Sequence, residues 1–355
     1  MTTGAGTTRT TDTGAETLAP DDPRLSWDGI GGWSGDSGRR LPLRMPVERL
    51  ATAMSANFSR IALTTAGVRF AVRTDAAELT LDMENDPGGS PLDVRVDGTL
   101  VHRWTGGPGR QRVTFPLPAG GPDPAEVEVW LPHLGITRIG AVSFRGHRSL
   151  RAAERSGPRW VAYGSSLTQC MYAAGPSETW PALVAAGRGW RLRNLGFAGE
   201  AYLDPVVARA VRDAPADVIT LELGINAYIR GAFTERSWGP AVCGFIDTIR
   251  DGHPDTPVVV LTPLSSPDRE KAVNSAGLTL EDTRAITEEA VRVLQRLGDR
   301  ALHPVDGLAL APVADAAHLY ADGLHPTAAG EHVLAERIGA ALGGIPLQRV
   351  ASLRP

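Results

Sequence analysis

The amino-acid sequence predicts an α/β chain of two domains, in which an all-β sandwich of the jelly-roll kind precedes a three-layer α/β/α domain with a parallel sheet. In the first half, short segments alternate apolar and polar residues, as half-buried strands do. After Pro158, apolar strands alternate with helical stretches that are long enough for parallel crossovers. These patterns place the two domains at residues 25–150 and 151–355. Residues 1–24, rich in Thr, Gly and Ala, are predicted to be a disordered tail.

The predicted strands of the sandwich follow one another at the spacing of short hairpins, with segments at 68–72, 78–82, 92–96, 100–104, 112–115, 126–130 and 141–144. Asp97-Gly98 favours a tight turn, so the strands on either side of it are expected to pair as a hairpin. No helix is predicted within this half. The tryptophans at 27, 33, 104 and 130 are expected in the sandwich core, with a carbohydrate-binding face as the alternative.

The second half begins after a polar stretch near 150–157. Its predicted strands are 160–163, 192–195, 218–223 and 258–261, and its predicted helices lie near 178–186, 205–213, 240–250, 280–297 and 328–342. Strands and helices that alternate in this way give a parallel sheet with helices on both faces.

Composition and charge exclude several classes of protein. The 36 basic and 40 acidic residues give a formal charge of −4, without the basic excess that nucleic acid or an anionic membrane would attract. Cys170 and Cys243 are too few for a disulfide framework, and no metal-ligand spacing is present. No signal peptide and no apolar stretch of about 20 residues is visible, so a cytoplasmic location is expected unless a signal has been removed.

Ser166, in Gly164-Ser165-Ser166-Leu167, follows the strand 160–163, and Asp322-Gly323-Leu324-His325-Pro326 lies near the C-terminus. A serine, an imidazole and a carboxylate are the parts of acyl-enzyme chemistry. Ligands of open parallel sheets gather beyond the carboxyl ends of the strands, where Ser166 is expected. The catalytic candidates are therefore Ser166, Asp322 and His325, although Ser166 or Asp322 could instead cap a helix.

Two later turns supply candidate donors for a developing oxyanion. Gly199 ends the segment that begins at Gly196, and Asn226 follows Gly224-Ile225. Glycine lets the backbone approach a reacting oxygen closely, and an asparagine amide donates hydrogen bonds. The alternative is a structural role, in which these residues only form turns.

The other reactive side chains are expected to be structural. His303, His318 and His332 lack a partner motif, and His253 before Pro254 is typical of a turn. Cys170, one helical turn beyond Ser166, is expected to be a buried small residue and not a second nucleophile.

Four segments, at 164–167, Gly199, 224–226 and 322–325, resemble in their order the sequence blocks of the GDSL or SGNH hydrolase superfamily. The resemblance covers residues 158–342. The resemblance implies a flavodoxin-like catalytic domain with Ser166, Asp322 and His325 as triad. It also implies the Ser166 and Gly199 backbone N–H groups and the Asn226 side chain as the oxyanion hole, with no metal and no bound cofactor. Two positions depart from the family pattern: Ser165 replaces an aspartate, and Ala227 stands where an aspartate is common.

The sandwich resembles the domain that precedes the hydrolase domain in some carbohydrate esterases and in a GDSL acyltransferase of tetracycline-type antibiotic biosynthesis. This resemblance implies transfer of a salicyl-type aryl acyl group from acyl-CoA, as co-substrate, to a hydroxylated polyketide acceptor. Two alternatives remain open, an esterase or deacetylase acting on small acyl esters of carbohydrates, and a non-catalytic carbohydrate-binding protein. Both enzyme hypotheses expect small-molecule partners only.

Overall fold

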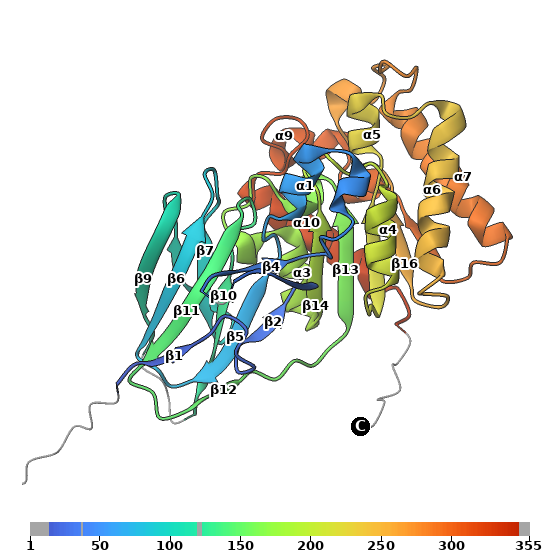
Figure 1. The fold of residues 1–355 in the computed structure, drawn as a ribbon. Coiled ribbons are helices and arrows are strands. Elements are labelled where there is room, and N and C mark those ends of the chain that lie inside the picture. Colours follow the sequence, from blue (N-terminus) through green and yellow to red (C-terminus); the bar gives the residue numbers. More distant parts are fainter. Residues whose placement is uncertain (1–13, 37, 119–122, 348–355) are drawn as a thin grey trace, which may run out of the picture.

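A computed structural model describes residues 14–36, 38–118 and 123–347 of the chain. Within these residues, two antiparallel sheets of six strands each form the N-terminal sandwich, and a parallel sheet of five strands forms the core of the C-terminal domain. Figure 1 shows the sandwich beside the α/β domain, with the parallel strands running between helices. The predicted fold class is confirmed.

The sandwich buries one apolar cluster between its two sheets. The first sheet has the order β3-β4-β11-β6-β9, with β1 paired to β11. Its strands are β1 (Glu16–Leu18), β3 (Gly32–Gly35), β4 (Arg40–Leu43), β6 (Glu78–Asn85), β9 (Gly109–Pro116) and β11 (Thr137–Arg145). The second sheet has the order β12-β5-β10-β7-β8, with β2 paired to β5. Its strands are β2 (Ser26–Asp28), β5 (Arg69–Thr74), β7 (Leu92–Val96), β8 (Thr99–Trp104), β10 (Ala125–Trp130) and β12 (Leu150–Ala152).

The predicted hairpin agrees with the structure, and so do two of the four tryptophan predictions. Strands β7 and β8 pair across Asp97-Gly98, and both turn residues have positive φ angles. Trp27 and Trp104 pack against the sandwich core. Trp130 is buried beneath the Arg69 guanidinium instead, and Trp33 stands edge-on against Trp27.

The predicted tail is too long. Residues 1–13 lie outside the described part of the chain, but Glu16–Leu18 forms β1, which pairs with β11 and buries Leu18. The composition of this segment predicted a tail. The strand forms because it pairs with β11, which is distant in the sequence, and because Leu18 is buried. At the other end of the sandwich, β12 extends the domain to Ala152 through its pairing with β5.

The prediction that no helix interrupts the sandwich sequence is wrong. Between β4 and β5 the chain forms a 3₁₀ turn (Leu50–Ala53) and helix α1 (Ala56–Ala62). Phe58 and Ile61 of α1 are buried in the core of the α/β domain, together with residues of its helices. The apolar surface that stabilises α1 belongs to the other domain, so the local sequence pattern did not reveal it.

The parallel sheet has the strand order β14-β13-β15-β16-β17, which is the flavodoxin-like order 2-1-3-4-5. Its strands are β13 (Arg159–Gly164), β14 (Arg191–Gly196), β15 (Val218–Glu222), β16 (Val258–Leu261) and β17 (Leu302–Val305). Strand β17 was not predicted, because it is four residues long and contains Pro304. As an edge strand it tolerates a residue without an N–H donor.

Helices cover both faces of this sheet. Trp160 and Ala162 of β13 pack with α3 (Trp180–Arg188) and α10 (Ala328–Gly343). Val161 and Tyr163 of the same strand point to the opposite face, toward α4 (Pro205–Arg212), α6 (Glu235–Arg250) and α7 (Leu280–Arg296). Short helices follow several strands: α2 (Ser166–Gln169), α5 (Ile225–Arg230), α8 (Gly307–Leu310) and α9 (Ala316–Leu319). In the described ranges, no helix is both long enough and apolar enough to span a bilayer.

Candidate active site

Ser166, His325 and Asp322 form one chain of hydrogen bonds beyond the carboxyl end of β13. The Ser166 Oγ lies 2.8 Å from His325 Nε2, and His325 Nδ1 lies 2.7 Å from Asp322 Oδ2. The Asp322 carboxylate can only accept at neutral pH, so Nδ1 carries the proton and Nε2 is free to accept one from Ser166. This arrangement permits general-base activation of the serine.

A tight turn holds Asp322 in place. Its Oδ1 accepts hydrogen bonds from the backbone N–H groups of Leu324, at 3.1 Å, and His325, at 2.7 Å. Partial burial by itself would raise the pKa of Asp322, but the hydrogen bonds from His325 outweigh it and keep this pKa below its ordinary value. Thr327, and not Asp322, caps the helix α10. The carboxylate is therefore ionised and directed at the imidazole.

Two of the three predicted oxyanion donors follow the strands β14 and β15, which flank β13 in the sheet. Gly199 has a φ of 74° at the third position of a turn closed by a hydrogen bond from Glu200 N to Phe197 O. A type II turn requires a positive φ there, which glycine supplies without strain. Asn226 Oδ1 accepts from Ala201 N at 3.1 Å, so its Nδ2 group points the other way.

A cavity of about 230 Å³ brings these residues together. It is lined by Ser166, Met171, Ala198, Gly199, Asn226, Ile229, Arg230, Leu324 and His325. Met171 and Ile229 are 37% and 42% exposed, and Tyr172 beside them is 45% exposed. The Tyr172 ring stands edge-on against the His325 imidazole at 5.7 Å. Exposed apolar side chains therefore lie close to the nucleophile, together with the polar Asn226 and Arg230.

The turn before the nucleophile depends on a residue that the sequence analysis missed. Glu222, at the end of β15, is buried, and its Oε2 accepts from both Ser165 N and Ser165 Oγ at 2.7 Å. Ser165 Oγ in turn accepts from Leu167 N and caps α2. Burial raises the pKa of Glu222, although the hydrogen bonds from Ser165 oppose this shift. A carboxylate thus reaches this turn from a neighbouring strand, where the family pattern has one at position 165. An acidic residue in the apolar run 218–223 was the available signal.

The remaining candidates have structural surroundings. Cys170 is buried, and burial raises the pKa of its thiol, which disfavours a nucleophilic thiolate. His253 is buried with its Nε2 2.9 Å from Val211 O. His318 and His332 are exposed and do not line the cavity at Ser166.

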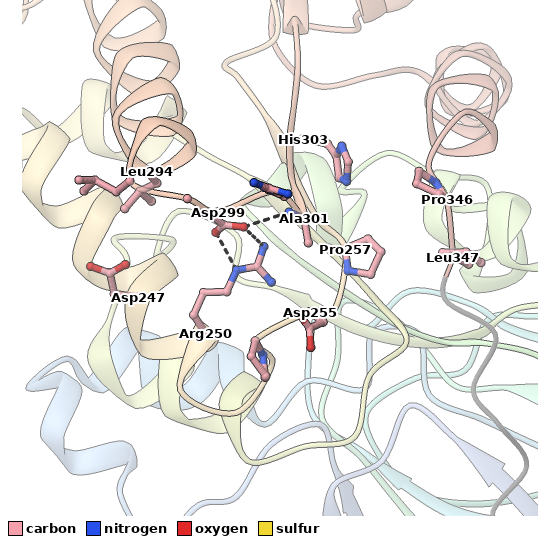
Figure 2. Close-up of a pocket in the computed structure, with 14 residues that line it drawn as sticks. Asp247, Arg250, Asp255, Pro257, Leu294, Asp299, Ala301, His303, Pro346 and Leu347 are labelled. Carbon is pink, nitrogen blue, oxygen red and sulfur yellow. Dashed lines mark hydrogen bonds and ion pairs between the residues drawn. The ribbon is translucent and has the colours of Figure 1, made fainter.

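His303 lines a different and larger cavity, of about 740 Å³. Figure 2 shows this cavity, with Arg250 reaching the Asp299 carboxylate. Pro257 and Ala301 in its wall precede β16 and β17, so the cavity lies at the amino ends of the strands. Ser166 lies at the opposite edge of the sheet, and His303 is not part of its surroundings.

Residues 162–333 match the GDSL-like lipase/acylhydrolase family. The domain that carries the hydrogen-bonded serine therefore belongs to that family, and the protein is an SGNH-type serine enzyme of acyl transfer or ester hydrolysis. No sequence among the curated proteins matches the chain.

Among solved structures, the chain is similar to the salicylyl-acyltransferase SsfX3 from a tetracycline biosynthetic pathway. The TM-score is 0.85 at 29% identity, over 94% of this chain and 99% of that one. It also shares its fold with a GDSL-like lipase candidate from Bacteroides ovatus ATCC 8483, with a TM-score of 0.77 at 19% identity over 93% and 97% of the two chains. The acetyl xylan esterase Est2A from the rumen bacterium Butyrivibrio proteoclasticus gives a TM-score of 0.66 at 11% identity over 93% and 98%. All three alignments include the sandwich as well as the α/β domain.

Proposed function

We propose that the protein is a cytoplasmic acyltransferase that moves a salicyl-type aryl acyl group from a CoA thioester to a hydroxyl of a tetracycline-type natural product. The observation that carries this proposal is the small, mainly apolar cavity beside Ser166. The Ser166 hydroxyl lines this cavity and is hydrogen-bonded to His325. The cavity volume of about 230 Å³ suits one small acyl group and not a whole polycyclic substrate. The similarity to a salicylyl-acyltransferase over both domains supports the same assignment.

In the first step, Ser166 Oγ attacks the thioester carbonyl carbon while His325 Nε2 takes the hydroxyl proton. Asp322 stabilises the imidazolium through the 2.7 Å contact at Nδ1. The carbon–sulfur bond then breaks, and His325 returns the proton to the leaving CoA sulfur. The acyl group remains on Ser166 as an ester.

The negative charge that develops on the carbonyl oxygen would be met by three donors: the backbone N–H groups of Ser166 and Gly199 and the Asn226 Nδ2 group. The bond from Ala201 N to Asn226 Oδ1 fixes the amide so that Nδ2 is the group available for the oxyanion. Loss of one such donor typically lowers kcat by about 10²- to 10³-fold.

In the second step, His325 Nε2 takes the proton of an acceptor hydroxyl, whose oxygen attacks the acyl carbon. The bond between that carbon and Ser166 Oγ then breaks, and His325 returns the proton to Ser166 Oγ. The acceptor must lie at the mouth of the cavity. Met171 and Ile229 line the cavity and expose apolar surface, and the exposed Tyr172 ring lies against His325. These apolar surfaces would favour a flat polycyclic molecule over water near the acyl carbon.

The test is product partition together with intact mass. Purified protein is incubated with salicyl-CoA, with and without a polycyclic phenol, and compared with Ser166→Ala and with Ser275→Ala, an exposed serine outside the cavity. We expect a salicyl adduct on the wild type and on Ser275→Ala, its loss in Ser166→Ala, and an aryl ester of the phenol as product. Free salicylate alone, with and without the phenol, would instead identify an esterase. An adduct that persists in Ser166→Ala would reject the site.

A further inference from the structure

The loop 196–200, called here the oxyanion loop, lies against a segment from the other domain. That segment, residues 44–64, runs between the sandwich strands β4 and β5, contains α1, and is called here the brace. The brace buries Phe58 and Ile61 in the core of the α/β domain and not in the core of the sandwich.

The first link between the two is Arg44. Its guanidinium donates to the carbonyl oxygens of Asn194, at 3.0 Å, and Gly196, at 2.8 Å, and lies 5.1 Å from the centre of the Phe197 ring. Its other hydrogen bonds go to Ile61 and Thr64 within the brace. Among the described residues, the hydrogen-bond partners of Arg44 include no carboxylate, although Arg44 is fully buried. Burying a guanidinium charge without a carboxylate partner costs free energy, and an apolar side chain could fill the same space without that cost.

The second link holds the end of the oxyanion loop. Glu200 accepts from Ser55 Oγ at 3.0 Å and from Asn57 Nδ2 at 2.7 Å, so both carboxylate oxygens are bound by the brace. Phe58 packs on Phe197 with ring centres 5.0 Å apart. A charged acceptor with two donors makes stronger bonds than a neutral one.

The third link runs through Gln169, the last residue of α2. Its Oε1 accepts from Ala198 N at 2.9 Å. Its Nε2 donates to Thr64 Oγ1, at 3.1 Å, and to His133 O, at 3.0 Å, both in the N-terminal half. Residues 196, 197, 198 and 200 are therefore each held by a contact from outside the loop. These contacts lie on both sides of Gly199, whose own carbonyl oxygen accepts a hydrogen bond from the Tyr202 hydroxyl at 2.8 Å.

We propose that the brace positions the oxyanion loop, with Glu200 as the positioning residue that transmits its hold to the Gly199 N–H. The N-terminal domain then contributes to the rate of acyl transfer without touching the substrate. The inference rests on the proposed role of Gly199 as an oxyanion donor. Misplacing a donor by about 1 Å can lower a rate by about 10²-fold.

The experiment compares Glu200→Ala, Glu200→Gln and Asn57→Ala with Thr80→Ala. Thr80 is the matched control, because it also loses a side-chain hydrogen bond, to Thr114 on the sandwich. Steady-state hydrolysis of a nitrophenyl ester gives kcat and KM. Binding of phenylboronic acid, which forms a tetrahedral adduct with the serine, is measured beside binding of benzoate, which does not need the oxyanion donors. Ser166→Ala is run in parallel, so that failure of the site is separated from failure of the brace.

We expect Glu200→Ala to lower kcat about 10- to 100-fold with KM nearly unchanged, and to weaken phenylboronic acid by a similar factor but not benzoate. Glu200→Gln, which keeps one acceptor oxygen, should recover most of the rate. Asn57→Ala should lower kcat a few-fold. Combined with Glu200→Ala, it should lower kcat little further. The proposal is overturned if Glu200→Ala has the same kcat as Thr80→Ala. It is also overturned if Glu200→Ala weakens the binding of phenylboronic acid and of benzoate equally. If Glu200→Ala does not fold, an Asn57→Ala variant with wild-type kcat overturns it.

Discussion

Restoring the family's aspartate at position 165 should damage this protein. In Ser165→Asp, the new carboxylate would stand where Ser165 Oγ now donates to Glu222 Oε2 at 2.7 Å. Aspartate caps helices as well as serine does, so the cap of α2 is preserved. What changes is that two carboxylates would share one buried site.

The size of the effect follows from the distance. Two unit charges about 3.5 Å apart repel by about 5 kcal/mol at an effective dielectric constant of 20. The lost hydrogen bond from Ser165 Oγ to a charged acceptor adds about 1.5 to 3 kcal/mol. Uptake of one proton limits the cost, and Glu222 is the group to take it, because burial already raises its pKa. For a domain of this size, about 5 kcal/mol lowers Tm by roughly 10 to 20 °C.

Thermal unfolding between pH 5 and pH 8 is the assay, with kcat/KM measured on the same samples. A carboxyl group whose pKa is raised in the folded state destabilises the fold at pH values above its unfolded pKa. The difference in Tm between Ser165→Asp and the wild type should therefore be largest at pH 8 and become smaller toward pH 5. Ser165→Asn, which has the same shape without the charge, is the control and should lose much less. In Ser165→Asp/Glu222→Gln, the amide can donate to the aspartate, so stability and rate should largely return.

A Ser165→Asp variant as stable as Ser165→Asn across this pH range would contradict the predicted repulsion between the two carboxylates. A double variant with no higher Tm and no higher kcat/KM than Ser165→Asp would contradict it as well. Either result would mean that Glu222 does not hold the turn before the nucleophile.

Three further perturbations test other parts of the structure. In Asp322→Asn we expect kcat to fall by roughly 10³-fold with little change in KM, because the amide cannot stabilise the imidazolium; a variant within 10-fold of wild type would contradict this role. Gly224 has a φ of 105°, and a Cβ there would lie 2.7 Å from Pro263 Cγ, so Gly224→Ala should lower both Tm and the rate, whereas Gly187→Ala in α3, with open space, should be neutral or stabilising. Burial lowers the pKa of His133 to about 4, so its contribution of about 3 kcal/mol is present above pH 6.5 and lost as the pH falls toward 4; His133→Gln should flatten this part of a stability curve measured by urea unfolding.

Elements with a regular local pattern were predictable. The helix predicted at 280–297 is observed at Leu280–Arg296, where Thr279 and Asp282 form a capping box. The helix predicted from 240 begins earlier, at Glu235, because the capping box at Thr234 starts it and Pro240 does not. Strand β17 and helix α1 were missed, since both are short and each is stabilised by residues far away in the sequence.

The same distinction applies to the site. The residues of the site could be found from local patterns, because Ser166, Gly199, Asn226 and the Asp322–His325 pair each follow a strand or precede a helix that such a pattern predicts. The folded structure is needed to see that Glu222, 57 positions away, brings a carboxylate to position 165, where the family pattern has an aspartate. The same structure brings Arg44 to Gly196 at the end of β14, across 152 positions. Hydrophobic periodicity records which face of an element is buried, but it carries no information about which distant element buries it.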